Sequence, residues 1–104
     1  MNKVVRDGLV AVLYSPGYGA GWSTWAPAEI REQILFDPGI VDLVENEKWE
    51  EAKAYAALKY PDFYPGGLED LHIEWMPVGT QFQVNEYDGN ESIEKRDSVD
   101  WYTA

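Results

Sequence analysis

The chain has 104 residues, 45% of them hydrophobic and 14% aromatic, which is typical of one folded domain and argues against a disordered segment. It contains no cysteine, so disulfides and thiolate metal sites are excluded. Its 19 acidic and 8 basic residues give a formal net charge of −11, which disfavours direct binding to nucleic-acid backbones and anionic membranes, because both require cationic surface. We therefore expect a single domain over residues 1–104, with no cofactor.

A β-hairpin is predicted at the N-terminal end. The segments Val4–Arg6 and Leu9–Tyr14 flank Asp7 and Gly8, a dipeptide that favours a two-residue type I′ turn because both turn positions need positive φ. Leu9–Tyr14 is apolar on both faces, whereas a half-buried strand would alternate. We expect this strand to be central, with a helical layer on at least one side.

Two to three short helices are predicted in the middle of the chain. The first spans Ala28–Leu35, with apolar residues four apart on one face. Asp37 followed by Pro38 predicts the start of a second, because an N-cap carboxylate and a proline at the first helical position both favour it. Asn46 is predicted to cap a third helix over Glu47–Lys59.

The C-terminal third is predicted to be a β-meander. Its expected strands are Leu71–Met76, Thr80–Tyr87 and Glu91–Arg96, with a short fourth piece at Val99–Tyr102. Because strands and helices are segregated along the chain, the predicted class is α+β, with an antiparallel sheet of about five to six strands packed against the helices.

The last hairpin gives a register that can be checked. A two-residue turn at positions 88–89 sets Val84 opposite Ile93, an apolar pair, and Glu86 opposite Glu91. The glutamate pair is unfavourable unless both side chains are well solvated or share a cation such as Ca²⁺. A solvated hairpin end is the default expectation, and no metal site is predicted.

The segment Ser15–Trp25 has the composition of a recognition loop. Its glycines allow close backbone approach, and three large aromatic side chains lie between and after them. It leads into a helix N-terminus, where free N–H groups favour an anion, so the loop could bind phosphates while a ring stacks on a base or sugar. The candidate ligand-binding residues are Ser15, Gly17, Tyr18, Gly19, Gly21, Trp22, Ser23, Thr24 and Trp25, with Arg6 and Arg31 as sources of positive charge.

The same segment is also compatible with a purely structural loop whose aromatic residues pack on the core. Its Gly-x-Gly-x-Gly pattern is neither the dinucleotide fingerprint nor a P-loop, and it lacks the P-loop lysine. Catalysis is the weaker hypothesis, because the single histidine, His72, lies in a predicted strand with no nucleophile placed beside it by the sequence.

The opening of the chain resembles that of small, functionally uncharacterised proteins of phages and prophages. The resemblance rests on RDGLVAVLYSPGYGAGWSTW at positions 6–25, and extends to Phe36–Pro38 and Glu86–Gly89. It implies an accessory protein acting in the bacterial cytoplasm. Small phage proteins of this kind include inhibitors of host immunity that sequester a nucleotide signal or bind a defence protein.

Two functions are therefore expected. The first is a non-enzymatic binding protein that sequesters a small anionic, nucleotide-like ligand at the Ser15–Trp25 loop, with a homodimer or higher oligomer compatible with this site. The alternative is an acidic protein–protein inhibitor that mimics nucleic acid and binds a basic host defence or nucleic-acid-processing protein.

Overall fold

The computed structural model describes residues 2–17, 21–63 and 67–95. In chain order the elements are β1 (Val5–Arg6), β2 (Leu9–Tyr14), the 3₁₀ helix η1 (Ser23–Trp25), α1 (Ala28–Phe36), α2 (Pro38–Glu45), α3 (Trp49–Lys59), the 3₁₀ helix η2 (Leu68–Asp70), β3 (His72–Pro77), β4 (Phe82–Tyr87) and β5 (Asn90–Lys95). The predicted strand piece Val99–Tyr102 lies outside the described residues.

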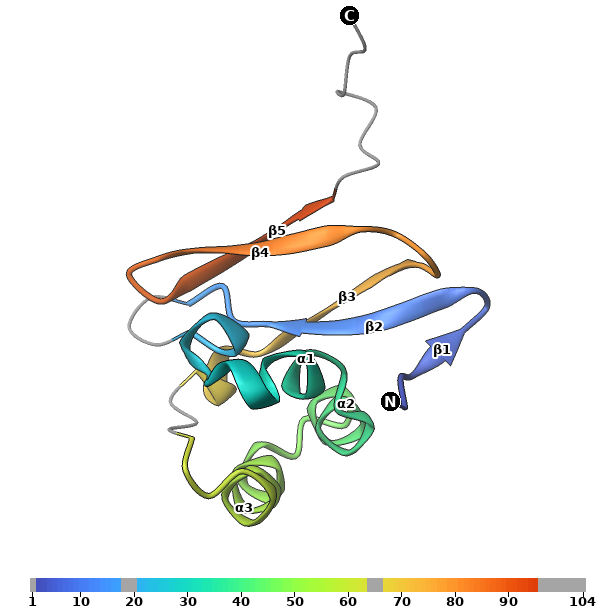
Figure 1. Cartoon of the computed structure of the whole chain (residues 1–104). Helices are drawn as coiled ribbons and strands as arrows, with labels where there is room; N and C mark the ends of the chain where they lie inside the picture. Colours follow the sequence, from blue (N-terminus) through green and yellow to red (C-terminus); the bar gives the residue numbers. More distant parts are fainter. Residues whose placement is uncertain (1, 18–20, 64–66, 96–104) are drawn as a thin grey trace, which may run out of the picture.

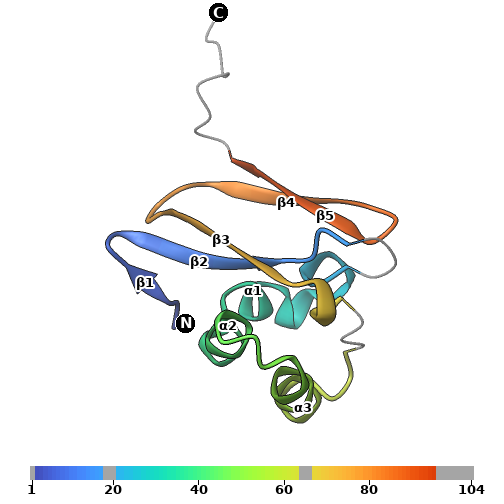
Figure 2. The ribbon, with the colours of Figure 1, turned by 180° about the vertical axis from the view of Figure 1, so that it is seen from behind.

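The described elements form three layers. Figure 1 shows the β4–β5 hairpin on one face of the β1–β2–β3 sheet and the three α-helices on the other, and the view from behind shows the same order (Figure 2). The strand pairings within the described residues are all antiparallel, so the predicted α+β class is confirmed. The described strands are divided between a three-stranded sheet, β1-β2-β3, and a two-stranded sheet, β4-β5, instead of the single sheet expected.

Strand β2 is apolar on both faces because it lies between the two outer layers. Ala11 and Leu13 belong to the large core cluster that includes the helices. Val10 and Val12 point to the other face, where they pack in a smaller cluster with Met76 and with side chains of the β4–β5 hairpin. The prediction of a central strand with helices on one side is confirmed, and the second hairpin accounts for its other apolar face.

Both predicted hairpin turns are present. Asp7 and Gly8 have φ of 51° and 78°, and Asp88 and Gly89 have φ of 50° and 84°, the left-handed conformation that a type I′ turn requires. The second turn produces the predicted register over positions 82–95, with Val84 opposite Ile93 and Glu86 opposite Glu91.

Asp37 connects the three helices. As predicted, it caps α2, because its Oδ1 accepts hydrogen bonds from Gly39 N at 2.9 Å and Ile40 N at 3.3 Å. The same buried carboxylate accepts from the end of α3, with Tyr60 Oη 2.5 Å and Lys59 Nζ 3.0 Å from its Oδ2. Helices α1, α2 and α3 therefore meet at one charged group.

This environment changes the proton affinities of the groups around Asp37. Burial alone would raise the pKa of Asp37, but the hydrogen bonds from Tyr60, Lys59 and Tyr55 outweigh it and lower the pKa below its ordinary value. In return, the hydrogen bond to Asp37 raises the pKa of Lys59, and burial together with the bond to Asp37 raises the pKa of Tyr60.

The predicted N-cap role of Asn46 is wrong. Asn46 follows the end of α2, where its side-chain amide donates to the backbone oxygen of Asp42 at 2.8 Å. Helix α3 begins two residues later than expected, at Trp49, after Glu47 has taken a positive φ of 56°. Asn46 therefore ends one helix instead of starting the next.

Within the described residues, none of the helices has the length and apolar character needed to cross a membrane.

Candidate functional site

The predicted recognition loop surrounds a buried carboxylate supplied by the chain itself. Glu91, at the start of β5, is 1% exposed. Its Oε1 accepts a hydrogen bond from Ser15 N at 2.8 Å, and its Oε2 accepts from Trp22 N at 2.8 Å and Thr24 N at 3.0 Å. The Thr24 hydroxyl adds a bond of 2.6 Å to the same Oε2. The N–H groups that the sequence offered to an external anion therefore donate to Glu91.

A backbone hydrogen bond also joins β5 to the start of the loop. Glu91 N donates to Ser15 O at 2.7 Å, so Ser15 is bonded to Glu91 through both its N–H and its carbonyl. Glu86, directly across the hairpin, accepts instead from Gly89 N at 2.7 Å. The like-charged pair is thus accommodated by N–H donors that serve each carboxylate separately, with Glu91 buried instead of solvated.

The loop aromatics have different environments. Trp22 is 0% exposed; its Nε1 donates to Ile34 O at 2.9 Å, and its ring meets Phe63 edge-on at 5.3 Å between centroids. Trp25 is 46% exposed. Trp22 is therefore part of the core, and Trp25 is the aromatic side chain of η1 that remains accessible.

Two loop glycines lie very close to neighbouring side chains. A Cβ at Gly17 would overlap the carboxylate of Asp70, and one at Gly21 would overlap the side chains of Thr24 and Trp25. Tyr18 and Gly19, which were also candidate ligand residues, lie outside the described residues.

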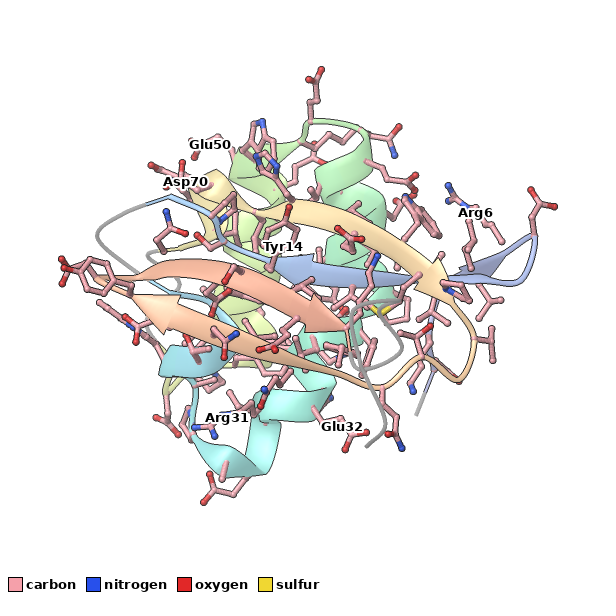
Figure 3. The ribbon with its side chains drawn as sticks, turned by 90° about the horizontal axis from the view of Figure 1, so that it is seen from above. Arg6, Tyr14, Arg31, Glu32, Glu50 and Asp70 are labelled. Atoms are coloured by element: carbon pink, nitrogen blue, oxygen red, sulfur yellow. The ribbon has the colours of Figure 1, made fainter. Side chains whose placement is uncertain are left out.

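A groove of about 980 Å³ opens beside this loop, between α1 and β4. Seen from above, α1 with Arg31 and Glu32 lies on the β4 side of the hairpin (Figure 3). The lining residues are Lys3, Ser23, Thr24, Arg31, Glu32, Leu35, Phe36, Thr80, Gln81, Phe82, Gln83, Val84 and Glu94. The volume falls in the range of small-molecule sites.

Three of the sequence candidates meet in this groove: Ser23, Thr24 and Arg31. Arg31 donates one hydrogen bond to Ala26 O at 2.9 Å. Arg6 lies elsewhere, because its guanidinium forms two hydrogen bonds with the Glu45 carboxylate, at 2.6 and 2.7 Å. That pairing raises the pKa of Arg6.

Sequence reasoning missed several groove residues that come from distant parts of the chain. Lys3 lies 4.3 Å from the centre of the Phe36 ring, and Phe36 packs edge-on against Phe82 at 6.1 Å. Glu94 accepts from two amides of β4, Gln83 and Asn85. No local motif identifies these residues, although the predicted hairpin register already placed Gln83 opposite Glu94.

The single histidine, His72, is not among the residues that line the groove. His72 is exposed at the start of β3 and meets the Tyr14 ring edge-on at 6.0 Å. In the part of the chain that the structure describes, no three histidine, aspartate or glutamate side chains gather as metal ligands.

Comparison of the chain with protein-family models, with curated proteins and with solved structures finds no match.

Proposed function

We propose that this protein is a non-enzymatic binding protein that sequesters a small anionic, nucleotide-like ligand in the groove between α1 and β4. The observation that carries the proposal is that two cationic side chains, Lys3 and Arg31, line one groove of a chain whose formal net charge is −11, together with Glu32 and Glu94. The resemblance of the opening segment to phage accessory proteins agrees with an anti-defence role in the bacterial cytoplasm.

The cationic side chains supply the anion-binding part of the proposal. A guanidinium has five N–H donors and suits phosphate oxygens, and the bond from Arg31 to Ala26 O uses one of them. Lys3 can add a second positive charge from the N-terminal segment. Ser23 and Thr24 also line this wall, although Ser23 is buried and the Thr24 hydroxyl donates to Glu91 at 2.6 Å.

The apolar part of the groove supports a ring-bearing ligand. Phe82 is half-buried, and Leu35 and Val84 also line the groove. Aromatic and aliphatic side chains with a few convergent polar groups are typical of small-molecule sites.

This assignment changes the role of the Ser15–Trp25 loop. Because the N–H groups of Ser15, Trp22 and Thr24 donate to Glu91, the loop does not offer them to phosphate. The loop instead fixes η1, and η1 presents Ser23 and Thr24 to the groove. The proposed ligand thus contacts the η1 end of the segment singled out by the sequence.

The test is isothermal titration calorimetry with a panel of linear and cyclic nucleotides, on the wild type and on three charge-matched variants. Arg31→Gln and Lys3→Gln should each weaken binding about tenfold or more, because a charge-assisted hydrogen bond is lost. Lys48→Gln makes the same charge change at an exposed residue outside the groove, and should have a much smaller effect. Absence of nucleotide binding, or equal effects of all three variants, would contradict the proposal.

A protein partner is the second candidate, and the exposed face of α3 favours it. Leu58 is 86% exposed, and Ala54 and Glu51 are exposed one and two turns before it. An apolar side chain on the same helix face as an acidic one would suit a basic partner. Binding of that kind should weaken steeply with added salt, and a pull-down at low and high salt would distinguish it from ligand capture.

A further inference from the structure

We infer that the groove between α1 and β4 is also a peptide-binding site, in which an extended segment of a partner protein pairs with the edge of β4 as a third strand of the β4–β5 sheet. In the described residues β4 pairs with β5 alone, so its other edge carries no strand. Figure 3 shows α1 on the side of β4 that faces away from β5. The inference goes beyond the proposed function and does not depend on nucleotide binding, because it uses the main chain of β4.

The groove follows the edge of β4 and does not lie over one of its faces. Its lining includes five consecutive residues, at positions 80–84. Side chains along a strand alternate between the two faces of a sheet, so a groove on one face would be lined by every second residue only. The lined stretch is long enough to pair with a segment of about five residues.

The hydrogen-bond pattern of the hairpin follows from its turn. Tyr87 lies opposite Asn90 and closes the two-residue turn as a hydrogen-bonded pair, so Glu86 opposite Glu91 is a non-hydrogen-bonded pair. The main-chain N–H of Glu91 agrees with this alternation, because it donates to Ser15 O at 2.7 Å instead of to β4. Every second residue of β4, counted back from Glu86, therefore directs its main-chain N–H and C=O groups away from β5.

Phe82 and Val84 are the residues of this set that line the groove. Among the described residues, no hydrogen bond outside the hairpin is found for their main-chain groups. A row of unpaired N–H and C=O groups on a strand edge is complemented by the main chain of another strand, which is how many proteins bind extended peptides.

The sequence of this edge does not protect it against pairing. Proteins commonly place charged residues or proline on exposed strand edges to prevent the addition of another strand. Positions 80–85, with the sequence TQFQVN, contain neither. By contrast β3, an edge strand of the other sheet, contains Glu74 and ends at Pro77.

The lining of the groove defines which peptide fits. Leu35 and Phe82 are half-buried, line the groove and pack against the smaller core cluster. Every second side chain of an added strand would lie beside Phe82 and Val84 and extend this cluster, so we expect apolar residues at alternate positions. Two cationic and two acidic residues line the groove, so the paired segment itself should be uncharged. The formal net charge of −11 favours basic residues on either side of that segment.

The experiment is calorimetric titration of the wild-type chain with the synthetic peptide KKTVTVTVTKK and with two N-methylated forms of it. One form is methylated at the backbone nitrogens of its valines and the other at those of its central threonines. Successive N–H groups of a strand point to opposite edges, so only one of the two sets can face β4. We expect one methylated peptide to lose affinity about tenfold or more, and the other to bind nearly as well as the parent peptide.

Amide hydrogen exchange followed by NMR locates the bound peptide. At saturating peptide, the amides of Phe82 and Val84 should exchange about tenfold more slowly or less, because they gain hydrogen bonds. The amides of Gln83 and Asn85, which face β5, are the internal control and should change much less.

A main-chain variant tests the same edge from the side of the protein. Val84→Pro removes an N–H that faces the groove and leaves the bonds to β5 in place, so it should weaken peptide binding about tenfold or more. Val84→Thr keeps the main chain and is the matched control, which should retain most of the affinity. Circular dichroism checks that both variants remain folded, and the methylated peptides give the same test on the unchanged protein.

The outcomes are distinguishable. Absence of binding by the parent peptide, equal effects of the two methylations, or no slowing at Phe82 and Val84 would each overturn the inference. Nucleotide titrations of the same protein separate it from the proposed function. Nucleotide binding without peptide binding would overturn this inference alone, and peptide binding without nucleotide binding would overturn the proposed function alone.

Discussion

Glu91 Oε2 lies 2.8 Å from the backbone nitrogen of Trp22, although the two residues are 69 positions apart in the chain. The same carboxylate also accepts from Ser15 and Thr24, so one side chain of β5 orders both ends of the segment between β2 and α1. A loop that by composition could bind an external anion is instead closed around an internal one.

The Glu91 carboxylate can be tested by a neutral substitution of the same shape. Glu91→Gln should lower the free energy of unfolding by about 1–3 kcal/mol, because an amide has one acceptor oxygen and its NH₂ group would face buried N–H donors. Urea denaturation measures the change. Glu86→Gln is the matched control: Glu86 accepts only from Gly89 among the described residues, and the remaining amide oxygen can serve that donor. Equal losses in the two variants would contradict the assigned role of Glu91.

The two tryptophans of the loop should respond differently to truncation. Trp22→Phe should cost about 1–3 kcal/mol, since it removes the Nε1–H bond to Ile34 O and leaves that buried carbonyl without its donor. Trp25→Phe should stay within about 0.5 kcal/mol, as expected for an exposed position. Thermal unfolding of both variants provides the measurement, and a larger loss at Trp25 would mean that it, and not Trp22, is the structural residue.

Acid should destabilise the protein in part through Asp37. Because its folded-state pKa is lowered, Asp37 contributes stability above the unfolded value of about 3.9, and this contribution is lost as pH falls through the folded value. Asp37→Asn should therefore be less stable near pH 7 and lose less stability than the wild type between about pH 5 and pH 2. Urea midpoints across this range test it. Asp62→Asn, at an exposed position, should instead follow the wild-type curve.

The sequence predicted those parts of the fold that depend on neighbouring residues. Both type I′ turns follow from an Asp-Gly dipeptide that takes positive φ, and the α2 cap follows from Asp37 next to Pro38. The prediction that Asn46 caps α3 was wrong because asparagine is suited to both ends of a helix. Here its side-chain amide donates to the backbone oxygen of Asp42. The division into two sheets could not be predicted, because it depends on which face of β2 the second hairpin covers.

The candidate site was only partly predictable for the same reason. Ser23, Thr24 and Arg31 were identified because they lie close together in the sequence, near one helix N-terminus. Glu91 was noticed only as an unfavourable partner of Glu86, and that conflict was the sole local sign of its special role. The repulsion between the two glutamates is relieved by backbone N–H groups that donate to Glu91 from 67 to 76 positions away in the chain. No periodicity or motif in the sequence links those groups to Glu91.

The distance along the chain between Glu91 and its donors also has a consequence for biosynthesis. Residues 15–24 leave the ribosome long before residue 91 is synthesised. During most of translation their backbone N–H groups therefore lack the Glu91 carboxylate that accepts their hydrogen bonds in the folded protein. Closure of the segment is therefore expected to be a late event that follows translation of β5. A chain that stalls before this strand would expose Trp22 to chaperones and proteases.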